Sequence, residues 1–211
     1  LSVGSVINEL SQNCSASAPY IAEFASRMGG VGSQAGMTVQ QIMGFAAVLD
    51  SNNQKLEASS TALSQVIVRI YQDPAKYARV AGMDVEKFAN LVKTDMNAAL
   101  IEFLSTLKQA GNMDVLSPMF KDMGENGSRA ISALSTLANH ISEVKAQQLV
   151  ANEAFEEATS IDKEFEVQNN TVMAGLEKAK KRVNEIAVEL GEKLQPVMRL
   201  VISSSTIALK A

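Results

Sequence analysis

Hydrophobic residues recur every three or four positions along most of this chain, and short polar segments separate the runs. This spacing is typical of α-helices with one buried face. The first such helix is expected from Val3 to Asn13, with Val6, Ile7 and Leu10 on one side. A second follows Pro19, a residue that suits the first turn of a helix. The pattern therefore predicts an all-α protein.

The segment from Met28 to Ile70 organises the predicted fold. Three glycines near residue 30 weaken the end of one helix, or allow close contact with another, and Gly36 ends the segment. Thr38 can then cap a new helix and form a capping box with Gln41. The buried stripe predicted for this new helix consists of Ile42, Phe45, Ala46 and Leu49.

The turn Asp50-Ser51-Asn52-Asn53 ends this helix, and the next is expected over Lys55–Tyr71. Shorter helices are predicted after it, each opened by a side chain that can accept hydrogen bonds from the helix N-terminus. The predicted caps are Asp73, Asp84 and either Thr94 or Asp95.

The second half of the chain predicts longer helices. One is expected from Ser128 to about Ala158, with a stripe made by Ile131, Leu134, Leu137, Ile141 and Val144. A second has hydrophobic residues at alternating steps of four and three, which is a heptad seam typical of coiled coils. That seam consists of Val172, Leu176, Ala179, Val183, Ile186 and Leu190.

Two domains are expected on this basis. Residues 1–125 would form a bundle of short helices, and residues 126–211 a long-helix hairpin or coiled-coil region. For the heptad seam, packing as a hairpin with the preceding helix is favoured over pairing with another molecule. The basic run that includes Lys178, Lys180, Lys181 and Arg182 is interpreted as a solvated face, because acidic residues flank it.

Composition supports a folded helical protein and excludes a disordered one. Hydrophobic residues make up 46% of the 211 residues and charged residues 20%. Aromatic residues are only 5%, so aliphatic side chains and the ten methionines must fill the core. A net charge of −4 disfavours nucleic acid as the main partner.

Candidate chemistry is sparse. Cys14 and His140 cannot form a metal site by themselves, and no base can be placed for Cys–His catalysis. Glu153, Glu156 and Glu157 lie close together but have no histidine partner, so they are interpreted as a solvated face. The glycine-rich segment lacks the ending of a phosphate-binding loop, and no strand precedes it. The sequence therefore predicts no catalytic, cofactor-binding or metal-binding residues.

Targeting segments are also not evident. No signal peptide is visible, and no run reaches the roughly 20 apolar residues that a membrane helix needs. The most apolar stretch, Leu200–Leu209, is interrupted by three serines. Because the chain starts at Leu1, it is expected to be a fragment of a longer protein.

Several motifs, in order along the chain, resemble the core region of phage tail tape measure proteins. That family has a glycine-rich helix end with an A-G-[LM]-[ST]-[VL] helix start, an A-x-G-T-A-L helix, a D-P-type break, a glycine before its next helix, an F-G-x-x-A-x-x-A-L segment and a closing G-x-x-L-x-P. The corresponding segments here are Ala35-Gly36-Met37-Thr38-Val39, Ala58-Ser59-Ser60-Thr61-Ala62-Leu63, Asp73-Pro74, Gly82-Met83-Asp84, Pro118-Met119-Phe120 through Ala130-Leu134, and Gly191 to Pro196.

The resemblance covers roughly Val6 to Val201. It departs from the family at two positions, since Ser60 and Asn53 stand where glycine is usual. Both are small or turn-tolerant residues, so they affect local geometry more than membership.

The resemblance implies structural work in tail assembly. Such proteins lie as extended helices in the lumen of the growing tail tube, set tail length, and leave at DNA ejection. Implied partners are tail tube subunits, tail assembly chaperones, tail tip proteins and further copies of the same chain. The implied location is the virion tail of a phage or prophage, and the host cytoplasm during assembly. No cofactor and no enzymatic activity are implied.

Two other classes of protein compete with this one. A bacterial helical coiled-coil interaction or sensor domain without catalysis would require a membrane helix or sensor domain nearby. An all-helical enzyme would require inward-facing acids or histidines at helical spacing. If the tape measure interpretation holds, the fragment alone is expected to be compact or oligomeric, because its apolar stripes need covering.

Overall fold

Helices make up the described part of the chain. The computed structural model describes residues 2–110, 116–118, 125–158, 177 and 180–182, and none of these lies in a strand. The all-α fold predicted from the sequence is confirmed. The chain divides into two compact units, Leu1–Ile161 and Asp162–Ala211. The first of these, called the helical unit below, contains nearly all of the described residues.

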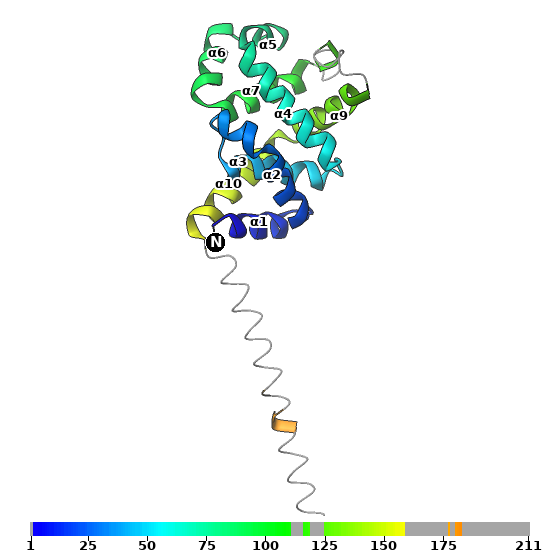
Figure 1. Ribbon diagram of the computed structural model, residues 1–211, viewed down its shortest axis with the longest axis vertical. Helices are drawn as coiled ribbons and strands as arrows, with labels where there is room; N and C mark the ends of the chain where they lie inside the picture. The colour runs from blue at the N-terminus through cyan, green and yellow to red at the C-terminus, as the bar shows by residue number, and fades with distance from the viewer. Residues whose placement is uncertain (1, 111–115, 119–124, 159–176, 178–179, 183–211) are drawn as a thin grey trace, which may run out of the picture. The chain divides into compact units, whose positions relative to one another are not determined.

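The helical unit is built from helices joined by short turns (Figure 1). Their bounds are α1 Ser2–Asn13, α2 Ala18–Gln34, α3 Val39–Ser51, α4 Leu56–Gln72, α5 Pro74–Val80, α6 Val85–Thr94, α7 Met96–Ala110, α9 Glu125–Asn139 and α10 Ile141–Glu157. Residues 116–118 are also helical.

Helix α3 lies at the centre of the helical unit. It packs against α1, α2, α9 and α10, and every residue from Ile42 to Leu49 is buried. The predicted stripe is therefore correct but incomplete, because the opposite side of α3 is buried as well. A helix that is apolar all round is typical of such a central position.

The start of α3 follows the sequence prediction. Gly36 has a φ of +73°, a left-handed conformation that glycine adopts without strain. The Gln41 amide donates to Thr38 Oγ1 over 3.2 Å, and the Thr38 amide donates to Gln41 Oε1 over 2.9 Å. The capping box is confirmed, and it satisfies two backbone donors that the helix cannot satisfy itself.

Carboxylates open three of the later helices in the same way. Asp73 accepts a hydrogen bond from the Lys76 amide at 3.0 Å, and Asp84 accepts one from the Lys87 amide at 2.8 Å. Between the alternatives Thr94 and Asp95, Asp95 is the residue that caps, since its Oδ1 lies 2.9 Å from the amide nitrogen of Ala98.

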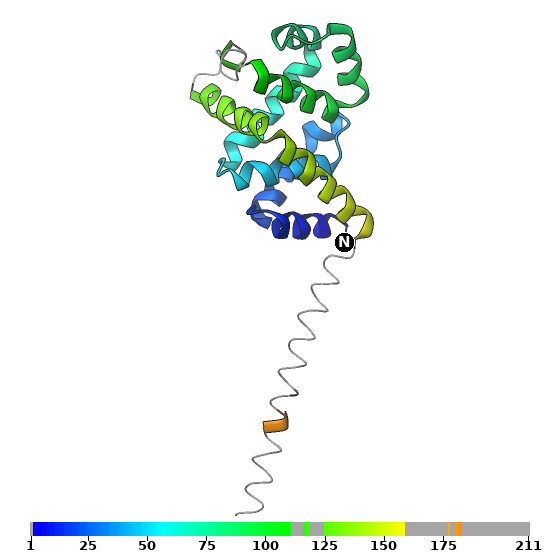
Figure 2. The ribbon, with the colours of Figure 1, turned by 180° about the vertical axis from the view of Figure 1, so that it is seen from behind.

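The single helix predicted over Ser128–Ala158 is instead two helices. Helix α9 ends at Asn139, His140 forms a turn, and α10 begins at Ile141 (Figure 2). The cause is tertiary: α9 packs on α4 and α7, whereas α10 packs on α3 and α1. The break lies beside the turn between α3 and α4, since His140 shares a pocket with Ser51 and Asn52.

The predicted boundary near residue 125 also differs from the structure. Helices α9 and α10 belong to the same compact unit as α1–α7, because they cover α3 and α4. All six positions of the heptad seam over 172–190 lie outside the described residues, although four other residues of that range are described. Glu177 and Lys180, Lys181 and Arg182 are helical and exposed, as expected for a solvated face.

Two glycines allow helices to pack closely. Helix α2 runs through all its glycines, and a Cβ atom on Gly32 would collide with the Ile42 side chain of α3. A Cβ on Gly44 would lie 2.5 Å from Gln148 Cγ and only 3.0 Å from the Gln148 backbone nitrogen. The α3–α10 contact is therefore a close backbone approach that a larger residue at position 44 would force apart.

This geometry predicts that Gly44→Ala destabilises the helical unit. Because backbone atoms of α10 cannot move aside as a side-chain end can, we expect a loss of about 1–3 kcal/mol in the free energy of unfolding. Gly30→Ala is the matched control: Gly30 lies within α2 and a Cβ there meets nothing within 4 Å. That control should gain about 0.5–1 kcal/mol. Urea denaturation measures both, and equal effects would contradict the close contact.

Candidate functional surfaces

A buried amide joins three helices near the Gly44 contact. Gln148 of α10 is only 6% exposed. Its Nε2 donates to the Gln41 carbonyl of α3 at 3.0 Å and to Asn97 Oδ1 of α7 at 2.8 Å, and Asn97 Nδ2 donates back to its Oε1 at 3.0 Å. Since each of these groups has a partner, the network fixes the position of α10 relative to α3 and α7.

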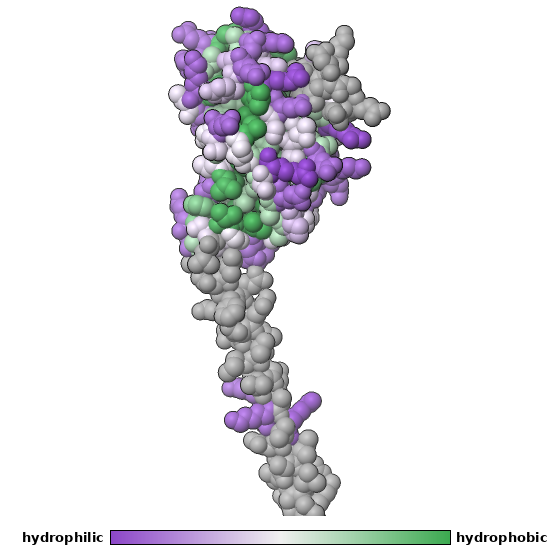
Figure 3. All heavy atoms as spheres, viewed as in Figure 1, coloured by the Kyte–Doolittle hydropathy of each residue, from purple (hydrophilic) through white to green (hydrophobic). Residues whose placement is uncertain are grey.

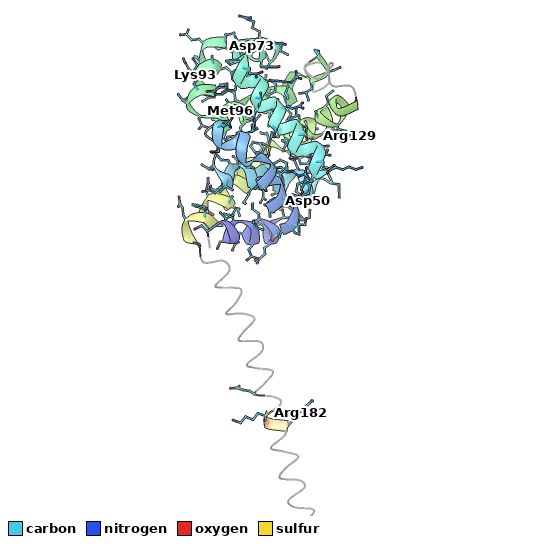
Figure 4. The ribbon with its side chains drawn as sticks, in the orientation of Figure 1. Asp50, Asp73, Lys93, Met96, Arg129 and Arg182 are labelled. Carbon is cyan, nitrogen blue, oxygen red and sulfur yellow. The ribbon has the colours of Figure 1, made fainter. Side chains whose placement is uncertain are left out.

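A second polar junction joins α2, α3 and α4. Asp50, labelled in Figure 4, lies near the end of α3 and accepts hydrogen bonds from the Ser17 amide at 2.6 Å and the Ser17 hydroxyl at 2.9 Å. Ser17 precedes the first residue of α2, so a carboxylate from another helix caps α2. The junction thereby fixes the angle at which α2 meets α3.

The Tyr20 hydroxyl is part of this junction. Burial raises the pKa of Tyr20 above its ordinary value of 10.0, and the negative charge of Asp50 raises it further. The Ser59 side chain lowers the pKa of Tyr20, although the Tyr20 and Ser59 hydroxyls do not meet the geometry of a full hydrogen bond. The phenol is therefore held in its neutral form.

Exposed hydrophobic side chains gather on α4. A groove of about 350 Å³ between α2 and α4 is lined by Val31, Ala35, Ile67, Val68 and Tyr71, together with Gln34 and Gln72. Val68 is 39% exposed and Tyr71 56% exposed. Figure 3 shows an apolar strip in this region of the helical unit, and a second apolar area lower on the same face. Apolar grooves of this kind are typical of contact surfaces.

A more polar groove lies on the other side of α4. It has a volume of about 470 Å³ and shares Val68 and Gln72 with the first groove. Its charged lining comes from Arg69, Asp73 and Lys76. The Asp73 carboxylate already caps α5, and Lys76 Nζ lies 5.7 Å from the centre of the Tyr77 ring. Asp73 and Lys76 therefore make local contacts at the start of α5.

The structure brings Cys14 and His140 to one pocket, which sequence reasoning could not do. The pocket has a volume of about 310 Å³ and also contains Glu143. The Cys14 thiol donates to the Leu10 carbonyl at 3.0 Å, and His140 Nδ1 lies 2.8 Å from Glu143 Oε1. Each side chain thus has a partner within four residues along the chain. Neither is arranged as a nucleophile and base that act together.

The acidic residues singled out in the sequence are exposed. Glu153, Glu156 and Glu157 lie on the outer face of α10. Within the described ranges, no group of three histidine, cysteine, aspartate or glutamate side chains is placed to hold a metal ion. Among the same residues, no helix is both long enough and apolar enough to cross a membrane.

The amide network predicts a coupled loss of stability. Gln148→Leu should lower the free energy of unfolding by about 1–3 kcal/mol, because the Gln41 carbonyl and the Asn97 amide lose their partner. Asn97→Ala should cost less when Gln148 is already replaced than when it is intact. Gln147→Leu is the control, since its Oε1 is buried without a partner to lose. Additive effects in a double-mutant cycle would contradict the network.

The raised pKa of Tyr20 predicts a pH dependence of stability. The stabilisation is fully present below the unfolded-state pKa of 10.0 and is lost as the pH rises through the higher folded-state pKa. Tyr20→Phe should remove part of the alkaline loss, as measured by urea denaturation below and above pH 10.0. Tyr71→Phe, at a side chain that is 56% exposed, should behave like the parent. Identical pH profiles for all three proteins would refute the assignment.

Comparison with known proteins places these helices in a family. The family model described as "phage-related minor tail protein" matches residues 1–120, which is more than half of the chain and spans α1 to α7. No curated protein and no solved structure matches this chain. The chain belongs to the phage-related minor tail protein family.

Proposed function

We propose that this chain is a segment of a tape measure protein, which sets tail length during assembly and is released at DNA ejection. The observation that carries the proposal is the family match over residues 1–120. It supports a structural component of a phage tail. The ordered motifs that resemble tape measure proteins run past this match, to Pro196, and support the finer assignment.

The family match falls on the helices that contain most of these motifs. Ala35-Gly36-Met37-Thr38-Val39 forms the corner between α2 and α3, where Gly36 and the capping box stop one helix and start the next. Asp73-Pro74 opens α5. The motifs are thus positions where the backbone requires a particular residue, which supports a shared fold for this region.

A ruler function has a simple physical basis in such a chain. An α-helix rises about 1.5 Å per residue, so the number of residues in an extended helical molecule translates directly into length. Tube subunits that polymerise around it would stop when the molecule is covered. In this proposal the chain contributes length and contact surface, and no residue is assigned a catalytic step.

The proposed partners are tail tube subunits, tail assembly chaperones, tail tip proteins and other copies of the chain. The proposed location is the lumen of the virion tail, reached from the host cytoplasm during assembly. A bacterial coiled-coil interaction or sensor domain is the alternative, and it has no support from the family match. The alternative predicts that changing the length of this chain has no effect on any phage tail.

The proposal predicts that tail length follows chain length. In-frame removal of two heptads from Val172–Leu190 should shorten tails by about 21 Å, and duplicating them should lengthen tails equally. Replacing the same heptads with different heptads of equal length should leave tail length unchanged. Electron microscopy of negatively stained tails measures tail length. The slope of tail length against the number of residues added or removed is expected to be about 1.5 Å per residue.

Other results would change the assignment. Tails of normal length that fail to infect would place the segment in ejection or tip assembly, and loss of all tails would indicate a role in initiation or folding. Normal, infectious tails from every length variant would rule out the ruler.

A further inference from the structure

Exposed hydrophobic side chains concentrate around the end of α4. Five large hydrophobic residues are exposed in the described part of the chain, and three of them, Val68, Tyr71 and Val80, lie on α4 and α5. Tyr71 is 56% exposed, whereas Tyr77, six residues later, is only 3% exposed. Such a concentration, on a fold that buries most of its other apolar side chains, is typical of a contact surface.

Two grooves flank a ridge on α4, called the α4 ridge below, which consists of Val68 and Gln72. These residues lie four positions apart, which places them one above the other on the same face of the helix. Both line the apolar groove beside α2, and both also line the polar groove on the other side of α4. Rows of this spacing, with a groove on each side, are the surfaces through which helices pack on one another.

The two grooves differ in chemistry. On the α2 side every lining residue is uncharged, and most are apolar. On the other side the lining includes the charged residues Arg69, Asp73 and Lys76. A molecule that covers the α4 ridge must therefore present an apolar row to one groove and a charged row to the other. That division is the property of an amphipathic helix.

The charge around the α4 ridge is positive. Residues 64–80 contain three basic side chains, Arg69, Lys76 and Arg79, and one acidic side chain, Asp73, although the whole chain has a net charge of −4. Lys76 and Arg79 are exposed and lie three positions apart on α5, so they share a face. The Asp73 carboxylate, at the corner between α4 and α5 (Figure 4), already accepts the Lys76 amide. The complementary molecule is therefore acidic.

Other modes of recognition fit this surface less well. None of the described residues lies in a strand, so that part of the chain has no strand edge to which an extended peptide could add. The basic side chains surround apolar ones and do not form the continuous basic stripe that binds nucleic acid. A flat bilayer cannot fill a groove between two helices. An acidic amphipathic helix satisfies both grooves and the sign of the charge.

We propose that the α4 ridge is a docking site for an acidic amphipathic helix of a different protein. Apolar residues at i and i+4 of that helix fill the groove beside α2 and pack on Tyr71. Aspartate or glutamate residues in its neighbouring row lie beside Lys76 and Arg79. The docking site is independent of the ruler, because binding to it is a property of the chain in isolation.

Selection from a library of helical peptides tests the docking site. The peptides are about 20 residues long, so that they are helical in water, with two neighbouring rows randomised, and the bait is the full chain. Selected peptides should carry apolar residues in one row and aspartate or glutamate in the other. Replacing those acids with lysine should weaken binding about tenfold, as measured by fluorescence anisotropy. Selected peptides without acidic residues, or no selected peptide at all, would overturn the proposal.

Tyr71→Ala tests the place of binding. It should weaken binding of the selected acidic peptide about tenfold, because an exposed tyrosine at the centre of a contact surface is a typical anchor. Leu149→Ala is the matched control, since Leu149 is 59% exposed and lies on α10. Both variants should keep the thermal midpoint of the parent, and the control should bind as the parent does. Equal binding by the two variants would place the peptide elsewhere and refute the site.

Lys76→Glu tests the sign of the charge. Lys76 is the third residue of α5, where a glutamate suits the helix N-terminus and preserves the fold. The variant should bind the acidic peptide about tenfold more weakly than the parent, and should recover binding of the peptide whose acids are replaced with lysine. Lys145→Glu, at an exposed residue of α10, is the control with the same change in net charge. A preference that does not reverse in Lys76→Glu would contradict the charge pairing.

Other occupants of the α4 ridge give different results. A dimer of the chain in sedimentation velocity that Tyr71→Ala dissociates would identify a second copy as the occupant. Binding to phosphatidylglycerol vesicles that Tyr71→Ala abolishes would identify a lipid surface. Either result would overturn the proposal, whereas a monomer that ignores vesicles and binds the acidic peptide would support it. The ruler fails separately, because tails of unchanged length in the length variants would leave peptide binding unaffected.

Discussion

The contact between α3 and α10 determines the arrangement of the other helices. At Gly44 the two backbones approach so closely that a single added carbon would meet the backbone of Gln148. The side chain of Gln148 then turns to satisfy the Gln41 carbonyl of α3 and Asn97 of α7. Close approach supplies dispersion contacts over the whole crossing, and the amide network permits only one register. Helices α1, α2 and α9 cover the remaining sides of α3.

Sequence reasoning succeeded where the cause of a structure is local. The capping box of Thr38 and Gln41, the left-handed Gly36 and the caps at Asp73 and Asp84 all depend on residues within three or four positions of each other. Such devices act on the backbone directly, so their residue types reveal them. The helical fold class followed from periodicity for the same reason.

Reasoning from sequence failed where the cause lies in another part of the chain. The stripe from Ile131 to Val144 has unbroken helical spacing, yet the helix is interrupted at His140, because its two halves dock on different helices. The second buried face of α3 and the role of Gly44 were not evident either, since both depend on α10, which follows about a hundred residues later. The meeting of Cys14 and His140 in one pocket is a third case. Periodicity identifies which face is apolar, but not what covers it.

A structural protein of a phage tail family leaves its evidence in such places. An enzyme concentrates constraint at a few side chains, whereas here constraint is spread over glycines, caps and apolar stripes, which are also the features that a family of structural proteins would share. The same apolar stripes can be covered by the chain itself or by other molecules, because burial is non-directional. Buried polar groups are directional, so they select one arrangement among those that would cover an apolar stripe, and in α10 that group is Gln148.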